Sequence, residues 1–474
     1  MRKSLLLLLA VVLVAATAVT AVAGTDFSGF YRSKGYVSNI KNYTSANYVN
    51  PTPANNSSTN SYVEQRIRLK FSTGEENVKA VLFLEQDMMW GDASGQTARN
   101  QGGAIQGDSI NLEAKNAYLW FKLPNTNADF TVGLQSVSDP YRGVFIGGAD
   151  VAGVLATFKF EPLSFRVGGF TPWERDTNQA DDSLIFISEA KFAPTKDLNV
   201  GLNFYFIRDG ADTLGASSGE IPASVSGFRV GGQVVSGVTK IYMPGVNFDI
   251  NAGPVKISGS AFMQFGDRVY DSGAPKTTFS GYAGDLRVDA NIGPAKVFLG
   301  GMYTSGDKPG TNDKIEGVVV AEDFKIFSSS SQPTSFDMQI LGPNGDDINT
   351  SRNLTYTTNN NRAAGGYAMN GVRLGATFIA AGATMQLGDK TTGKVGAGYL
   401  RANTKAPVTL TGTNLRDNKD MGIEVNANVN YNILKGLDFG LYGAYAWLGD
   451  GYKVSGSPDP DNLYDVHFRL NYAF

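Results

Sequence analysis

The feature that most restricts the fold is a unit of two alternating segments joined by a tight turn, which recurs along the chain. Two copies are closely similar, VNFDINAGPVKISGSAFMQFGD at residues 246–267 and LRVDANIGPAKVFLGGMYTSGD at residues 286–307. Each copy holds the sequence N-x-G-P between stretches in which apolar and polar residues alternate. Alternation with a period of two predicts strands with two different faces, and the Gly-Pro pair suits a tight turn. The recurring unit is therefore a β-hairpin.

Short and long connections alternate between these strands. Besides N-x-G-P, we expect tight turns at STGEEN, LPNTNA, FEPLS, APTKDLN and NILKGLD, and a further one near residues 380–383. One rim of tight turns and one rim of long loops is typical of a transmembrane β-barrel, whereas a soluble sandwich or propeller gives no reason for this sorting. The long connections are rich in Asn, Ser, Thr, Asp and Gly and cover about residues 39–60, 91–110, 139–151, 173–183, 209–238, 267–278, 306–366, 403–418 and 449–462.

The number of strands also fits a barrel. Counting from Phe27 to Phe474 gives roughly 18 strands of about 9–12 residues, the length and even number typical of such folds. The register of residues 371–401 is ambiguous, so a barrel of about 16 strands stays open. We predict an all-β chain, a transmembrane antiparallel β-barrel over residues 24–474 without an internal domain boundary.

The first residues, MRKSLLLLLAVVLVAATAVTAVAG, predict export from the cytoplasm. Arg2 and Lys3 precede an uncharged apolar run that ends in Ala-Val-Ala at residues 21–23. This order predicts a signal peptide over residues 1–23, with a membrane anchor as the alternative. No later apolar run approaches the roughly 20 residues of a transmembrane helix. The sequence has no Cys, which excludes disulfides, thiolate metal sites and c-type haem attachment.

The strands carry charges on one parity and apolar residues on the other. In YVEQRIRLKF, at residues 62–71, the apolar side chains alternate with Glu64, Arg66, Arg68 and Lys70. Hydrocarbon cannot hydrogen-bond to the backbone, so a sheet in a membrane must close, with its apolar face toward lipid and its polar face toward water. We therefore expect the charged parity to face the lumen. The final stretch NLYDVHFRLNYAF has the same two faces and should pair with the first strand.

Six cations form the main candidate site of this lumen. The last strand and the first two strands are neighbours in a closed barrel, and their lumen-facing cations would make one basic wall: Arg32, Lys34, Arg66, Arg68, Lys70 and Arg469. Cations in a narrow aqueous pore raise the local concentration of anions. Alternatively, these residues form ion pairs and only brace the wall. The carboxylates expected in such pairs are Glu64, Glu113, Asp285, Asp289, Glu424 and Asp465.

The connection at residues 306–366 is the longest, and loops of this length are usually functional or disordered. Its candidate carboxylates for a constriction are Glu322, Asp323, Asp346 and Asp347. Folded inward, this insert would narrow the pore and set its carboxylates against the basic wall. Folded outward, it would be a solvated surface loop. The sequence does not decide between the two directions.

Catalytic and metal chemistry find little support in the sequence. His467 is the only histidine and lies on the lumen-facing parity of the last strand, whereas a Ser-His-Asp relay or a His-based metal site needs further groups beside it. The acidic tract SPDPDNLYD at residues 457–465 lacks the roughly 12-residue calcium-loop pattern with its final glutamate. We predict no enzyme activity, no cofactor and no metal site. The net charge of −3 gives no reason to expect a nucleic-acid partner.

Over residues 24–474 the chain resembles a bacterial outer-membrane porin, in its alternating strands, tight turns, long loops and terminal aromatic residue. The resemblance implies a water-filled channel for passive diffusion of small hydrophilic solutes, surrounded by outer-membrane lipid. It also implies that the barrel assembly machinery recognises Phe474, and it leaves homotrimer and monomer both open.

A narrower resemblance lies in VGLQSVSDPYRGVFIGGAD at residues 132–150, which is similar to a segment of alginate-export barrels where G-R-Q precedes a G-D-x-R-x-x-G loop. Leu134 stands where that family has Arg, and its Trp and R-x-F-D elements do not follow. The alternative functions are therefore export of an acidic polysaccharide, or a closed barrel that binds a partner or encloses a periplasmic protein. The matching positions are Gly133, Gln135, Asp139, Arg142, Gly147 and Gly148.

Overall fold

The computed structural model describes most of the chain after residue 23 as β-structure. The described residues are 24–39, 59–92, 102–105, 110–174, 177, 182–210, 229–230, 233–234, 237–271, 273, 275–306, 313–321, 336–341, 375–404, 418–452 and 461–474. Within these ranges, no helix is long and apolar enough to cross a membrane.

The strands follow one another along the chain with a single short 3-10 helix, η5 (Asp450–Tyr452), near the end. The strands are β1 (Asp26–Ser38), β2 (Asn60–Glu75), β3 (Val78–Met89), β4 (Leu112–Lys122), β5 (Ala128–Ser138), β6 (Gly147–Phe160), β7 (Leu163–Trp173), β8 (Ser183–Thr195), β9 (Leu198–Asp209), β10 (Arg229–Val230), β11 (Gln233–Val234), β12 (Gly237–Ala252), β13 (Val255–Met263), β14 (Phe265–Tyr270), β15 (Thr277–Phe279), β16 (Tyr282–Ile292), β17 (Ala295–Thr304), β18 (Lys314–Ile315), β19 (Ala376–Gly388), β20 (Thr391–Ala402), β21 (Asp420–Leu434), β22 (Leu437–Leu448) and β23 (Leu463–Ala473).

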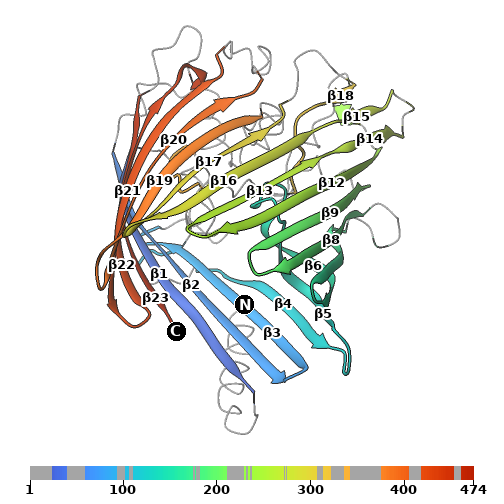
Figure 1. Cartoon of the computed structure of the whole chain (residues 1–474), viewed down its shortest axis with the longest axis horizontal. Coiled ribbons are helices and arrows are strands. Elements are labelled where there is room, and N and C mark those ends of the chain that lie inside the picture. The colour runs from blue at the N-terminus through green and yellow to red at the C-terminus, as the bar shows by residue number, and fades with distance from the viewer. Residues whose placement is uncertain are drawn as a thin grey trace.

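The sheet closes on itself because β1 pairs antiparallel with both β2 and β23. In Figure 1 the blue first strands and the red last strands lie side by side, and the colours between them follow the wall in chain order. The 21 strands of the closed sheet make 18 barrel strands, since β14 continues β13, β15 leads into β16, and β18 is a short addition beside β15. The prediction of an 18-stranded antiparallel barrel is confirmed, and the alternative of 16 is excluded.

The tight turns fall where the sequence predicts them, with one exception. Turns join β2 to β3, β4 to β5, β6 to β7, β8 to β9, β12 to β13, β16 to β17 and β21 to β22. The turn expected at residues 380–383 is wrong, because these residues lie inside β19 and the chain reverses at 389–390 instead. Glycine is needed at position 382 for a reason other than a turn, because a Cβ atom there would lie 2.5 Å from the ring of Phe298 on β17. The glycine lets a ring lie flat against the strand.

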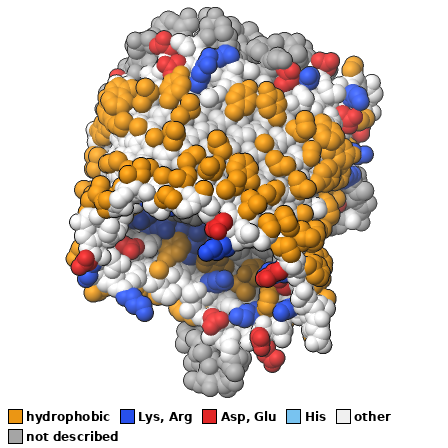
Figure 2. Space-filling view, in the orientation of Figure 1, with side chains coloured by type: hydrophobic (Ala, Val, Ile, Leu, Met, Phe, Trp, Pro, Cys, Tyr) orange, Lys and Arg blue, Asp and Glu red, His pale blue; other side chains and the backbone are white. Residues whose placement is uncertain are grey.

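The outer surface of the barrel is apolar, as the alternation predicts. Large side chains that point away from the lumen are strongly exposed, among them Leu202 at 63%, Val395 at 59% and Phe27 at 53%. Figure 2 shows hydrophobic side chains in bands across the outer wall. Aromatic rings on the outward parity of the last strands are exposed too: Tyr431, Tyr445, Trp447, Tyr472 and Phe474. A closed sheet with such a surface satisfies its backbone and can lie in hydrocarbon.

The two ends of the barrel sheet meet at Phe474. Its backbone N–H donates to the Gly29 carbonyl at 3.1 Å, and the Gly29 N–H donates back to the Phe474 carbonyl at 2.9 Å. The Phe474 ring lies 5.5 Å from that of Phe27, measured between centroids. The last residue therefore completes the joint between β23 and β1.

Candidate functional site

The six cations of the basic wall lie together on the lumen side of β23, β1 and β2. Arg32 lies opposite Arg66, and Lys34 lies opposite Arg469. Their strands turn the other parity outward, where Val37 is 47% exposed. Along β2, Arg68 and Lys70 continue the row toward the rim of tight turns.

Two of these cations are paired with carboxylates of β3. The Nε and Nη2 groups of Arg66 donate to the two oxygens of Asp87, each at 2.7 Å, and Arg68 donates to Glu85. The Nε atom of Arg66 also lies 3.4 Å from a Glu85 oxygen. Glu85 and Asp87 are almost fully buried. This part of the basic wall is a network of ion pairs that links β2 to β3, with carboxylates that differ from those expected.

The remaining cations have more varied surroundings. Arg32 donates from Nε to the Asn471 side chain at 3.1 Å, and its guanidinium lies 4.7 Å from the centroid of the Phe30 ring. Within the described part of the chain, the Lys70 ammonium has no hydrogen-bond or ion-pair partner. With Lys79, seven cations share the lumen face of β1, β2, β3 and β23 with five carboxylates, an excess of two positive charges: Asp26, Glu64, Glu85, Asp87 and Asp465.

Three segments fold into the lumen and form what we call the inner core: residues 139–146, 316–321 and 336–341. The backbone N–H of Ala321 donates to the Phe145 carbonyl at 2.9 Å, which joins the first segment to the second. A buried large apolar side chain stabilises a fold by about 1.5–3 kcal/mol. The inner core contains nine that are at most 2% exposed: Tyr141, Val144, Phe145, Val318, Val320, Phe336, Met338, Ile340 and Leu341.

Asp139 shapes the first of these segments. Its carboxylate accepts four backbone N–H groups, from Tyr141 and Gly143 at 2.8 Å and from Phe145 and Ile146 at 2.7 Å. Burial raises the pKa of this carboxyl to about 6, and the four donors act against that shift. A carboxylate with this many donors fixes the whole turn, because each donor would otherwise be buried without an acceptor.

Arg142 attaches the same segment to the opposite wall. It has a φ of 60°, in the left-handed region that residues other than glycine rarely adopt. From there it donates to Asp285 on β16, and its Nη2 donates to Ser258 Oγ on β13 at 2.7 Å. Arg142 and Asp285 are both almost fully buried, so removing either side chain would leave the other with an uncompensated buried charge.

Two wall side chains hold the insert between β17 and β19. Gln264 lies between β13 and β14 and pairs with Val319 as a backbone would, through Nε2 to the carbonyl at 2.7 Å and Oε1 from the N–H at 2.8 Å. Glu424 on β21 accepts the N–H groups of Gln339, Ile340 and Leu341 at 2.7–2.8 Å. The described residues 316–321 and 336–341 of the insert therefore lie inside the barrel, whereas β18 belongs to the sheet.

The inner core occupies one side of the lumen. Its apolar residues pack on lumen-facing side chains of β5–β9, β12, β13, β15–β17 and β19–β23, and this cluster contains no residue of β1–β4. The lumen face of β1–β3 instead bears the charged side chains of the basic wall and its carboxylates. Figure 2 shows Lys and Arg side chains gathered in the hollow of the barrel. The polar side of the lumen thus lies opposite the inner core.

Solved structures with this architecture are bacterial outer-membrane proteins. Acinetobacter baumannii OccAB4 superposes with a TM-score of 0.53 at 9% identity, covering 96% of this chain and 99% of that chain. A BenF-like porin from Pseudomonas fluorescens Pf-5 gives 0.53 at 11%, covering 96% and 99%. Pseudomonas aeruginosa OccK9 (OpdG) gives 0.53 at 12%, covering 95% and 98%.

The fold is that of a porin-type outer-membrane barrel. No protein-family model and no curated protein matches the sequence. At sequence identities of 9–12%, the similarity concerns the path of the backbone. The roles of individual residues in this porin-type barrel must therefore be inferred from the contacts they make in this structure.

The segment that resembles alginate-export barrels stabilises the fold of this porin-type barrel. Asp139 and Arg142 hold the inner core, as described above. Gln135 is buried on β5, and its Nε2 donates to the carbonyls of Thr131 and Gly153 at 3.2 and 3.1 Å. Gly133 and Gly148 have positive φ angles of 126° and 86°. These contacts and backbone angles account for five of the six matching positions through folding alone.

Other predicted candidates have simpler outcomes. The carboxylates Glu322, Asp323, Asp346 and Asp347 lie outside the described residues. His467 faces the lumen, where its Nδ1 lies 2.7 Å from an Asp465 oxygen and its ring stacks on Tyr442 at 4.6 Å between centroids. In the described ranges, no group of three or more His, Cys, Asp or Glu side chains could hold a metal ion.

Sequence reasoning missed Glu85 and Asp87 as partners of the basic wall. Their signal lies in the tight turn at residues 76–77, which pairs Glu75 with Val78 and so fixes the register of β2 on β3. Counting outward from this turn sets Arg68 opposite Glu85 and Arg66 opposite Asp87. The partner of Arg142 has no such signal, because Asp285 lies 143 residues further along the chain.

Proposed function

We propose that this chain is an outer-membrane porin that lets small hydrophilic solutes diffuse passively through the barrel. The observation that carries the proposal is the division of the lumen between an apolar inner core and a charged wall. The inner core narrows the barrel, and the remaining path runs beside the basic wall. Water and solutes can use such a path because charged side chains line it.

The proposal includes a preference for anions. The excess of two positive charges over the lumen face of β1, β2, β3 and β23 raises the local concentration of anions. Arg66 and Arg68 balance the charges of Asp87 and Glu85, so the excess depends on their presence. Removing both arginines would bring the count to five cations against five carboxylates.

The test is conductance of the purified protein in planar bilayers. We expect single channels, and a reversal potential in a KCl gradient that indicates anion selectivity. Arg66→Ala with Arg68→Ala should shift this potential toward cation selectivity. Lys70→Ala should shift it in the same direction without leaving a buried carboxylate unpaired, since Lys70 has no described partner. Lys390→Ala, at the exposed turn before β20, is the matched control and should change nothing.

The outcomes separate the parts of the proposal. A folded protein without conductance would contradict the porin function. Conductance with an unchanged reversal potential in the Lys70 and arginine variants would leave the basic wall with a bracing role only. Block by an acidic polysaccharide from the tight-turn side would favour the exporter, and absence of conductance with a bound partner would favour the binding role.

The same proposal has three further parts. The barrel assembly machinery recognises Phe474, outer-membrane lipid surrounds the barrel, and the protein is either a homotrimer or a monomer. Phe474 supports the first, because its exposed ring ends the strand that completes the barrel. The size of the detergent-solubilised particle would decide the last.

A further inference from the structure

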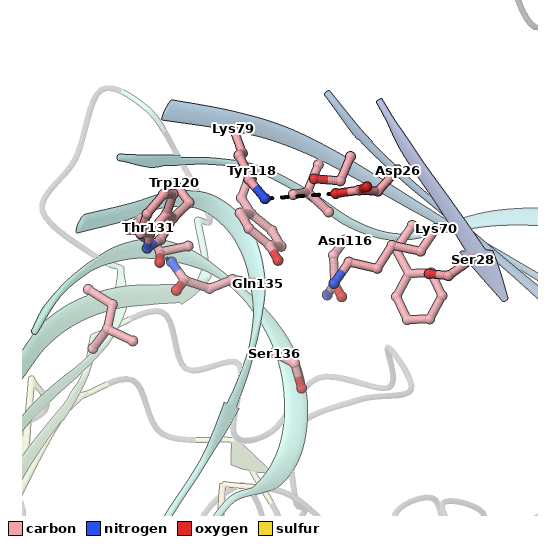
Figure 3. A pocket seen from close by; sticks show the side chains of 14 residues that line it. Asp26, Ser28, Lys70, Lys79, Asn116, Tyr118, Trp120, Thr131, Gln135 and Ser136 are labelled. Carbon is pink, nitrogen blue, oxygen red and sulfur yellow. Dashed lines mark hydrogen bonds and ion pairs between the residues drawn. The ribbon is translucent and has the colours of Figure 1, made fainter. Parts of the chain in front are cut away.

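A hollow of about 670 Å³ lies on the lumen side of β1–β6, near the rim of tight turns. Trp120 is opposite Lys79, the second residue of β3, and opposite Thr131 on β5. Tyr118 precedes Trp120 by two residues and therefore points to the same side of β4. Figure 3 shows both rings directed into the hollow, with Gln135 beside them. The volume is within the range of small-molecule sites.

The two rings have faces available to a ligand. Both side chains are half-buried, and no described ring or cation stacks on either of them. The lumen-facing position opposite Tyr118 is Gly133, where a Cβ atom would lie 3.2 Å from the Tyr118 Cβ. A side chain at residue 133 would collide with the β4 backbone, because its Cβ would lie 2.5 Å from the Ala117 carbonyl oxygen, so no side chain from this position covers the Tyr118 ring.

Hydroxyl and amide groups surround these rings. Asp26 and Lys79 are 3.8 Å apart and offset each other's charge, as the dashed line in Figure 3 marks. Lys70, with no described partner, adds three N–H donors. The neutral hydrogen-bonding side chains of the lining are Ser28, Ser72, Asn116, Thr131, Gln135 and Ser136.

We propose that this hollow is a binding subsite for a pyranose ring, and the proposal rests on the porin function proposed above. A pyranose has a flat C–H face that packs on an aromatic ring and a rim of hydroxyls that both donate and accept hydrogen bonds. Tyr118 and Trp120 supply the surface for the face, and the serine, threonine and amide groups supply partners for the rim. A flat aromatic acid would use the rings and leave most of these polar groups without partners. Binding of this kind is weak enough for release, which a channel requires.

Binding can be followed through Trp120 itself. The chain has four tryptophans, so Trp90→Phe, Trp173→Phe and Trp447→Phe together leave Trp120 as the only indole. We expect maltose and methyl glucoside to change the emission of this variant in detergent in a saturable way. Mannitol, an acyclic polyol without a flat C–H face, should not do so.

Channel block provides the second measurement. Maltose should interrupt the current of the wild-type protein, and Trp120→Ala should raise the half-blocking concentration about fivefold, the effect of losing one aromatic contact. Trp120→Phe keeps a ring and should have a smaller effect. Trp447→Ala removes a lipid-facing indole and should leave the block unchanged.

The results distinguish this inference from the porin function. Open channels with neither sugar block nor a sugar response of Trp120 would overturn the subsite and leave the porin proposal intact. Response to benzoate but not to the sugars would also overturn it. A saturable sugar response of Trp120 in a protein that forms no channels would support the subsite and contradict the porin function.

Discussion

Glu424 is the residue through which the barrel wall holds residues 336–341, and Glu424→Gln should release them. One carboxylate oxygen accepts the N–H groups of Ile340 and Leu341, and the other accepts those of Gln339 and the Asn426 side chain. Whichever oxygen becomes the amide nitrogen, two donors lose their acceptor and meet another donor. At about 1.5–3 kcal/mol for each hydrogen bond to a charged group, the attachment weakens by about 3–6 kcal/mol.

This loss should be measurable in two ways. Hydrogen exchange at the amides of residues 339–341 should become faster in Glu424→Gln, because the N–H groups of these residues donate to the Glu424 carboxylate. The single-channel conductance should rise, because the segment fills lumen space next to β21.

Glu161→Gln is the matched control, since Glu161 lies exposed at the turn between β6 and β7 and its loss changes the same charge. The reasoning would be refuted by a Glu424→Gln protein whose amide exchange and conductance both equal those of the wild type. Higher conductance in the Glu161 variant as well would indicate a general effect of charge.

Two further predictions concern the inner core and the joint of the barrel. Arg142→Ala leaves the buried Asp285 carboxylate without its partner and should destabilise the protein in thermal unfolding by about 3–5 kcal/mol, an effect that adding Asp285→Ala should partly reverse. An Arg142→Ala protein with the wild-type Tm would show that the Arg142–Asp285 ion pair does not stabilise the fold. Deleting Phe474 removes two backbone hydrogen bonds to Gly29 and a ring contact with Phe27, and should lower the yield of barrel that resists unfolding in cold SDS on gels. An equal yield would mean that the joint closes without its last residue.

The barrel was predictable because its signals are local. Alternation assigns each side chain to the lumen or to lipid, and the tight turns fix which strands pair, so the neighbourhood of Arg32, Arg66 and Arg469 follows from counting. The same counting would have found Asp87 opposite Arg66. The turn expected at residues 380–383 failed because small residues can indicate a close approach as well as a turn, and only the position of Phe298 distinguishes the two.

The inner core was not predictable in the same way. Val319, Phe336 and Leu341 belong to a connection without periodicity, and their burial depends on single wall side chains far away in the sequence. Gln264 and Glu424 look like ordinary polar residues of a lumen face, and nothing in their spacing reveals that they bind backbone groups of another segment. The direction of a loop is decided by such contacts, which no local pattern records.

The pairing of β1 with β23 bears on how the protein is made. Synthesis completes β1 long before β23, so the edge of β1 that pairs with β23 has no partner until the whole chain has been made. A product truncated before Leu463 lacks the strand that β1 and β22 both require, and leaves two rows of unsatisfied backbone groups facing lipid. Closure of this sheet therefore requires the full length of the chain up to its last strand.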